Sequence, residues 1–300
     1  MKEIYNELEY RDWRQSKQTL QLFAQILGKY KLALAPSRNH WWHVSLRPTV
    51  SGFSTGPLRV GAASFEFELD LIRHRLVYHS NIPSRKAFSI INISVSDFYG
   101  TIQRLLREDG ITPPRIYAFA YDMGNLPSFA ENKEKAAYDS SAVEQYFRII
   151  NAVTHVFEQF SGRFSGKASA PQLFWHSFDL AISRFSGEPV PPGYLGNADA
   201  ITLEGYSHEV IAFGFWPGDE VMPEAAFYSY AHPLPDALVE QPLLPESAYW
   251  GKWKMSSMAL LRWQDLIKEP EPEAALLSFL QSAYEAGAEC LNWNVEQLRR

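Results

Sequence analysis

Successive strand-like segments of this chain are joined by short turns rather than by helices. The clearest strand covers residues 65–71, where Phe65, Phe67 and Leu69 alternate with acidic residues. Parallel neighbours would need crossovers of about a dozen residues or more, so this pattern excludes a repeated βαβ arrangement. We therefore predict an α+β fold with antiparallel sheets flanked by helices.

Four segments have the apolar spacing that is typical of amphipathic helices. The predicted helices cover residues 12–27, 96–110 and 141–162, and the last begins at Pro272. Gly28 is the expected stop of the first helix, because glycine commonly ends helices. Ser96 is the expected cap of the second.

Strand-like segments follow the first and third predicted helices. We expect strands at residues 41–47, 65–71, 76–79, 88–93, 173–185, 210–215, 226–230 and 257–261. Each half then reads helix, four strands, helix, so a duplicated unit and two unrelated halves are both open interpretations. We place an N-terminal half at residues 1–112, an irregular connector at 113–139 and a C-terminal half at 140–300, packed as one compact unit.

The net charge of −6 comes without a basic tail or a Lys/Arg-rich stripe, which argues against nucleic acid or an anionic membrane as partner. Neither the N-terminal stretch nor any later run is apolar enough to predict a signal segment or a membrane span. The single cysteine, Cys290, cannot form an internal disulfide. We therefore expect a cytoplasmic protein whose partner is a small molecule.

The run Asn39-His40-Trp41-Trp42-His43 stands at the entrance to the strand predicted over residues 41–47. Two histidines around two tryptophans combine titratable, metal-competent groups with large apolar rings. On a strand, His40 and His43 would point to opposite faces, so joint chelation requires His40 to lie in the preceding loop. The run is our first candidate for part of a binding or catalytic site.

A second histidine motif, His208-Glu209, stands at the head of the strand predicted over residues 210–215. If the two strand ends are neighbours, His43 and His208 can serve as acid/base groups while Glu209 orients a histidine or a water. Alternatively, His40, His43 and His208 bind a divalent transition metal such as zinc or iron. Pocket lining without a metal and a purely structural role are the remaining interpretations.

Charged side chains in apolar surroundings supply further candidates. Asp179 and Arg184 lie within the apolar segment 173–185, where buried charges should be paired. A ligand-binding pair and a structural salt bridge are both open interpretations. Arg184 or Lys167 would hold an anionic group of the substrate.

Four tryptophans near these groups are the expected walls of a pocket: Trp41, Trp42, Trp175 and Trp216. The leading hypothesis is an enzyme that acts on a small organic substrate in an aromatic- and His-lined pocket between the two halves, with hydrolysis and metal-dependent oxidation both open. The alternative is a non-catalytic protein that binds a sugar or an aromatic metabolite.

The same residues resemble an uncharacterised bacterial family, the domain of unknown function 5996. The matching segments are residues 39–44, 174–175, 177–181, 184–187, 207–211, 214–218 and 284–286. Two positions depart from the family pattern, which has a small residue at His176 and arginine at Glu188. The departures argue against an essential role for His176, and the resemblance implies no particular activity.

Overall fold

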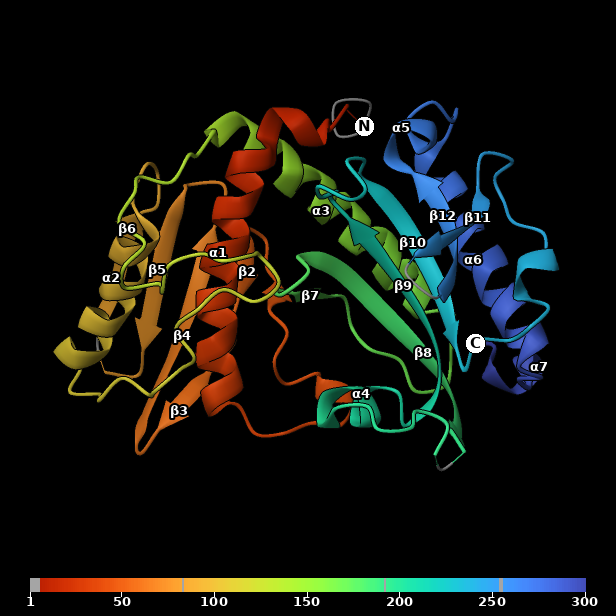
Figure 1. Ribbon diagram of the computed structural model, residues 1–300, viewed down its shortest axis with the longest axis horizontal. Helices are drawn as coiled ribbons and strands as arrows, with labels where there is room; N and C mark the ends of the chain where they lie inside the picture. Colours follow the sequence, from red (N-terminus) through yellow and green to blue (C-terminus); the bar gives the residue numbers. More distant parts are fainter. Residues whose placement is uncertain (1–5, 83, 192, 254–255) are drawn as a thin grey trace.

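The computed structural model describes residues 6–82, 84–191, 193–253 and 256–300, so the first five residues of the N-terminal stretch lie outside the description. Two antiparallel sheets of six strands carry helices on their faces, which confirms the predicted α+β class. The sheets lie at opposite ends of the molecule, with α1 (Tyr10–Leu34) between them (Figure 1). No helix in the described part of the chain is long and apolar enough to cross a membrane.

The N-terminal sheet has the order β1-β2-β4-β5-β6, with β3 paired to β4. Its strands are β1 (Arg47–Pro48), β2 (Gly52–Ser54), β3 (Leu58–Val60), β4 (Ala63–Asp70), β5 (Arg75–Ser80) and β6 (Ser84–Ser89). The apolar side chains of β4 face α1, as in the contact of Phe67 with Tyr30. The helix α2 (Val95–Glu108) packs beside α1, where the rings of Phe23 and Phe98 stack at 4.1 Å.

The helix α1 is longer than predicted and continues through Gly28 to Leu34. Its predicted apolar stripe is fully buried, as the 0% exposure of Leu20, Phe23 and Leu27 shows. Gly28 does not stop the helix; a Cβ there would overlap the indole of Trp175, so glycine permits the close approach of that ring.

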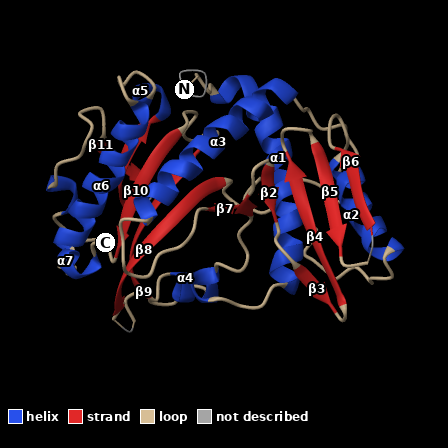
Figure 2. Cartoon of the chain, turned by 180° about the vertical axis from the view of Figure 1, so that it is seen from behind, coloured by secondary structure: helices blue, strands red, loops and turns tan. Residues whose placement is uncertain are grey.

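The C-terminal sheet has the order β11-β12-β10-β9-β8-β7. Its strands are β7 (Gln172–Phe174), β8 (Asp179–Pro189), β9 (His208–Trp216), β10 (Ala226–His232), β11 (Tyr249–Trp253) and β12 (Ser256–Arg262). The helices α3 (Ser140–Ser161) and α6 (Pro272–Cys290) pack on one face of this sheet, and the other face looks toward α1 (Figure 2). Each half therefore has the predicted order of helix, strands, helix, with six strands in place of four.

Short elements complete the fold. They are the 3-10 turns η1 (Asn39–Trp41) and η2 (Leu238–Glu240) and the helices α4 (Ala200–Gly205), α5 (Trp263–Leu266) and α7 (Val295–Leu298). The N-caps of two long helices differ from expectation, because Ser94 caps α2 and Asp139 caps α3. The observed caps lie close to the predicted helix starts. Several polar residues near each start can serve as caps, so the sequence does not single one out.

The strand predicted over residues 41–47 is wrong. His40 and Trp41 have φ values of 56° and 59°, which place both in the left-handed region and form the turn η1. The strand β1 covers just Arg47–Pro48, and Leu46 before it makes an isolated bridge to Leu173. The strand predicted over residues 173–185 is likewise interrupted, because Phe178 has a φ of 65° and separates β7 from β8.

Residues 112–139 contain neither helix nor strand. Polar side chains of α1 form hydrogen bonds with the backbone of this segment. The Gln25 side chain donates to the Tyr121 carbonyl at 2.9 Å and accepts from the Tyr121 amide at 2.7 Å. Thr19 donates to the carbonyl of Ala137 at 2.8 Å. These hydrogen bonds satisfy the buried polar side chains of Thr19 and Gln25.

Candidate functional site

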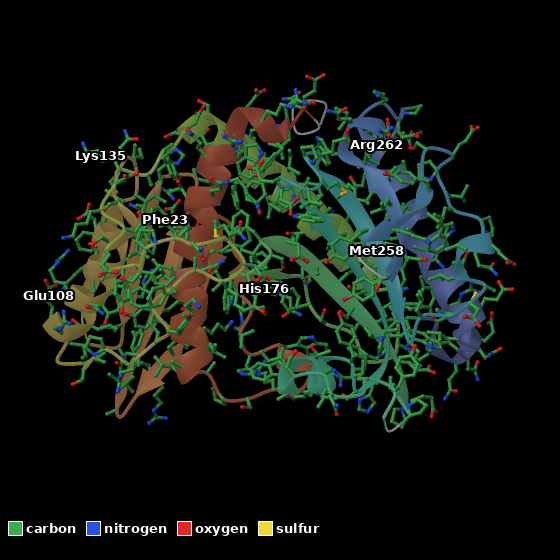
Figure 3. The ribbon with its side chains drawn as sticks, in the orientation of Figure 1. Phe23, Glu108, Lys135, His176, Met258 and Arg262 are labelled. Atoms are coloured by element: carbon green, nitrogen blue, oxygen red, sulfur yellow. The ribbon has the colours of Figure 1, made fainter. Side chains whose placement is uncertain are left out.

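A cavity of about 1320 Å³ lies between α1, the turn η1 and the open face of the C-terminal sheet. Alternate residues of the strands point into it. Those residues are Asp179, Ala181, Ser183 and Phe185 of β8, Val210, Ala212 and Trp216 of β9, Tyr228 and Tyr230 of β10, and Met258 and Leu260 of β12. His176 and Met258, both labelled in Figure 3, belong to the lining of this cavity. Its volume exceeds the roughly 300–1,000 Å³ that is typical of small-molecule sites, so a small organic molecule fits within part of it.

The buried carboxylate of Asp179 lines the sheet side of the cavity. It accepts hydrogen bonds from the hydroxyls of Ser177 and Tyr228, one on each oxygen. Burial and the neighbouring carboxylate raise the pKa of Tyr228 well above its usual value, so this phenol stays protonated. Each oxygen of Asp179 keeps further lone pairs that can accept from a ligand.

Gly214 of β9 makes room for Tyr228, its cross-strand partner. A Cβ at this position would overlap the Tyr228 ring. We expect Gly214→Ala to lower the free energy of unfolding by about 2 kcal/mol, because the ring must move away from Asp179. Gly100→Ala is the control, since that exposed helical position has open space and should gain up to about 1 kcal/mol. Equal urea midpoints for both variants would contradict the packing argument.

Lys17 of α1 lies on the opposite wall and is 4% exposed. Its ammonium donates to the Gln21 side chain at 2.9 Å and forms no ion pair with any described residue. Burial lowers the pKa of Lys17 to about 8, against the weaker opposing pull of Asp219, Asp179 and Glu220. Gln21 is itself fixed, because it donates to the carbonyl of His176 at 2.6 Å.

Sequence reasoning missed Lys17. The available signal was a polar stripe at a spacing of four, Lys17, Gln21 and Gln25, beside the apolar stripe of the helix. Such a stripe is typical of the solvent face of a helix. Here every residue from 19 to 31 is buried, so the stripe faces the cavity and the connector instead.

His40 lines the cavity beside Phe185. The two rings stack, with their centroids 4.2 Å apart. Both ring nitrogens are engaged: Nδ1 lies 3.1 Å from the Gly205 carbonyl and Nε2 lies 2.6 Å from the ammonium of Lys167. Nε2 therefore accepts from Lys167 and Nδ1 donates to the carbonyl, which is the neutral form. Burial, the charge of Lys167 and nearby His208 lower the pKa of His40, partly offset by backbone hydrogen bonds.

The three predicted metal ligands do not meet. His208 is near His40, with ring centroids 5.6 Å apart, and its Nδ1 lies 3.0 Å from the Ser207 hydroxyl. His43 is engaged elsewhere, because its Nδ1 accepts from the Arg38 amide at 3.2 Å. The described residues contain no group of three or more His, Cys, Asp or Glu side chains placed to hold a metal ion. Convergence of His40, His43 and His208 was the wrong expectation, because η1 is a turn and not a strand.

Glu209 also lies away from the cavity. It follows His208 on β9, and its carboxylate accepts from the Ser186 hydroxyl at 2.9 Å and from the Trp293 indole at 2.8 Å. Alternation along β9 turns Glu209 to the side opposite Val210, which lines the cavity. The predicted catalytic set of His43, His208 and Glu209 therefore does not assemble at the cavity.

Arg184 points to the helix-covered face of the sheet. Its guanidinium lies over the rings of Phe160, Tyr284 and Phe164, at 3.4, 4.6 and 4.9 Å from their centroids. It donates to the Phe160 carbonyl at the end of α3. The expected pair of Arg184 and Asp179 does not form, because an odd spacing along β8 puts the two side chains on opposite faces.

The four tryptophans that were predicted to form the pocket walls do not all lie at the cavity. Trp41, Trp42 and Trp216 line the cavity. Trp175 belongs to the core instead, packing on Gly28 and donating its indole N–H to the Val44 carbonyl at 2.8 Å. Lys167 does not line the cavity, and its ammonium lies 5.5 Å from the centroid of the Trp42 ring.

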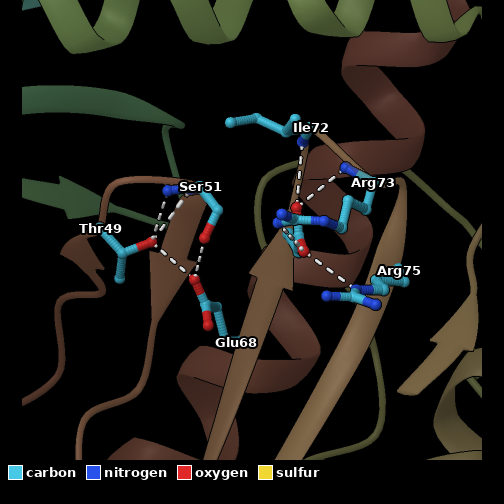
Figure 4. Close-up of polar contacts among 8 residues, drawn as sticks. Thr49, Ser51, Glu68, Ile72, Arg73 and Arg75 are labelled. Atoms are coloured by element: carbon cyan, nitrogen blue, oxygen red, sulfur yellow. Dashed lines mark hydrogen bonds and ion pairs between the residues drawn. The ribbon is translucent and has the colours of Figure 1, made fainter.

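The acidic residues of β4 have structural partners. Asp70 accepts from the amides of Ile72 and Arg73 and from the Arg75 guanidinium, at 3.2, 2.9 and 3.0 Å (Figure 4). Glu68 accepts from the hydroxyls of Thr49 and Ser51. These carboxylates fix turns of the N-terminal sheet and do not reach His43.

Neither curated protein sequences nor solved structures give a significant match. One family model matches residues 5–300, essentially the whole chain, and its description is a family of unknown function. The chain therefore belongs to that family, DUF5996.

Proposed function

We propose that this protein is an enzyme that acts on a small organic substrate in the cavity between α1 and the C-terminal sheet. The observation that carries the proposal is the placement of Lys17 and Asp179. Both line this cavity, both are at least nine-tenths buried, and neither has an ion-pair partner among the residues that the structure describes.

Burying a charge without an opposite charge in contact costs free energy. Lys17 has a single neutral partner, Gln21, and Asp179 has two, Ser177 and Tyr228. Residues that hold unpaired charges against a cavity are typical of sites that recognise polar groups of a ligand. We expect a substrate with an acceptor or electrophilic group for Lys17 and a donor, such as a hydroxyl or an amine, for Asp179.

The pKa of Lys17, lowered to about 8, leaves a useful fraction of neutral amine at neutral to mildly alkaline pH. A neutral amine can accept a proton or attack an electrophile. The rings of Trp41, Trp42 and Trp216 provide flat apolar surfaces for the body of the substrate.

The test is incubation of the purified protein with a cellular metabolite extract, followed by mass spectrometry over time. We expect one or more metabolites to be consumed by the wild type but not by Lys17→Met or Asp179→Asn. Lys31→Met is the matched control, because Lys31 is also buried on α1 but contacts the Ser45 carbonyl outside the cavity. Equal metabolite profiles for all four proteins, with no compound bound, would contradict the proposal.

A non-catalytic binding protein is the second candidate, favoured by one observation. The buried indole N–H of Trp41, on the cavity wall, has no acceptor among the described residues, and buried donors normally have one. A ligand acceptor would satisfy it. Binding of a metabolite without its conversion, lost in the Lys17 and Asp179 variants, would favour this candidate over the enzyme.

A further inference from the structure

We propose that Lys17 is a nucleophile that forms an imine with the carbonyl group of an aldehyde or ketone substrate. This inference rests on the proposed function, since it requires that a small molecule enters the cavity. It names the substrate class and the bond that the cavity is built to form.

Three buried lysines on α1 have different surroundings. Lys17, Lys29 and Lys31 are 4%, 5% and 5% exposed. The Lys29 ammonium lies over the rings of Tyr117 and Trp175, at 5.1 and 5.6 Å. That of Lys31 donates to the Ser45 carbonyl. The contacts of Lys29 and Lys31 tie α1 to neighbouring segments, whereas Lys17 lies on the wall of the cavity.

A hydrogen bond to Gln21 orients the amine of Lys17. A neutral Lys17 can donate one N–H to Gln21 Oε1, at 2.9 Å, and keep its lone pair free. Gln21 cannot turn away easily, because its other end donates to the His176 carbonyl at 2.6 Å. Gln21 is therefore a positioning residue that holds the amine at one place on the wall.

The lining of the cavity suits a carbonyl substrate. The cavity supplies apolar rings for the body of a carbonyl compound and places the hydroxyls of Ser177 and Tyr228 on the sheet side, both bound to Asp179. Burial lowers the pKa of Lys17 to about 8, so the nucleophilic form is accessible near neutral pH. A lysine activated by desolvation in this way is suited to imine chemistry.

The step balances without a further reactant. The neutral amine attacks the carbonyl carbon, the C–N bond forms, and the electron pair of the C=O π bond moves to oxygen. Nitrogen loses one proton and oxygen gains one, which gives a carbinolamine. Loss of the hydroxyl with a second proton then forms C=N and releases one water.

The experiment traps the imine by reduction. The full-length protein is incubated with pyruvate or benzaldehyde and sodium cyanoborohydride, which reduces C=N to a stable secondary amine. Peptide mapping then locates the adduct, whose added mass is that of the probe less one oxygen atom. We expect Lys17 to be labelled at pH 7 at least about tenfold faster than exposed Lys268, because a lower pKa leaves far more neutral amine.

Lys31 is the internal control in the same sample. Burial lowers its pKa to about 8 as well, with Arg47 and Arg38 contributing, but it does not line the cavity and should remain unlabelled. The Lys17→Met variant should lose the fast adduct and keep slow surface labelling. Labelling of Lys31 as fast as Lys17 would overturn the proposal, since the cavity would then confer no advantage.

The outcome separates this inference from the proposed function. If metabolites from the extract bind or are consumed in a Lys17-dependent way, yet no carbonyl probe labels Lys17, the imine is wrong and the cavity remains an enzyme site. If nothing binds and Lys17 is unlabelled, both proposals fail.

Discussion

Replacement of Lys17 by methionine is expected to raise the free energy of unfolding at pH 7 by about 2 kcal/mol. Burial lowers the pKa of Lys17 to about 8 from its ordinary value of 10.5. Between these values the unfolded chain binds more protons than the folded chain, so stability increases with pH. The buried ammonium therefore costs its full free energy below pH 8, and the cost disappears as the pH approaches 10.5.

Urea unfolding of the wild type and of Lys17→Met at pH 7 and at about pH 10 tests this expectation. The advantage of the variant should be largest at pH 7 and nearly absent at the higher pH. Lys268→Met, at a site whose side chain is 73% exposed, should change little at either pH. A variant that is less stable than the wild type at pH 7 would show that Lys17 is a structural residue.

The second large effect is expected at Arg184. We expect Arg184→Ala to lower the free energy of unfolding by about 3 kcal/mol, because the guanidinium fills the space between three rings and alanine leaves a cavity. Arg184→Met should cost less than about 1 kcal/mol. Methionine fills much of the volume that the arginine side chain occupies. The Phe160 carbonyl still accepts a hydrogen bond from the Arg163 amide at 3.1 Å.

The pair of Arg184 variants distinguishes a packing role from the substrate-binding role that the sequence pattern suggests. If Arg184 has a packing role, the free energy of unfolding decreases with the side-chain volume that is lost. Metabolite conversion by Arg184→Met then stays close to that of the wild type. A stable Arg184→Met protein that has lost conversion would return Arg184 to the active site and contradict its assignment to the helix-covered face.

The long periodic elements were predictable from the sequence. The alternation of Phe65, Phe67 and Leu69 identifies β4, and the apolar stripes identify α1, α3 and α6. These elements follow from local periodicity because one face of each is buried. Their ends were less predictable: α1 continues through Gly28 because Trp175, distant in sequence, packs there.

The candidate site was only partly predictable, since its geometry depends on turns and on contacts distant in sequence. Asp179, Trp41, Trp42 and Trp216 do reach one cavity. The histidine convergence failed because two left-handed residues, His40 and Trp41, replace the expected strand. Lys17 was overlooked because a polar stripe on a helix normally indicates solvent, and only the tertiary structure places it against a cavity.

Competitive trace labelling of the lysines with acetic anhydride, read by peptide mapping from about pH 6 to 11, tests the central claim most directly. It reports both the titration and the accessibility of each amine. The account predicts that Lys17 titrates near 8 and reacts, whereas Lys31, with a similar pKa but no place on the cavity wall, reacts far more slowly. A Lys17 that titrates with the surface lysines, or that is as protected as Lys31, would contradict a ligand site built around it.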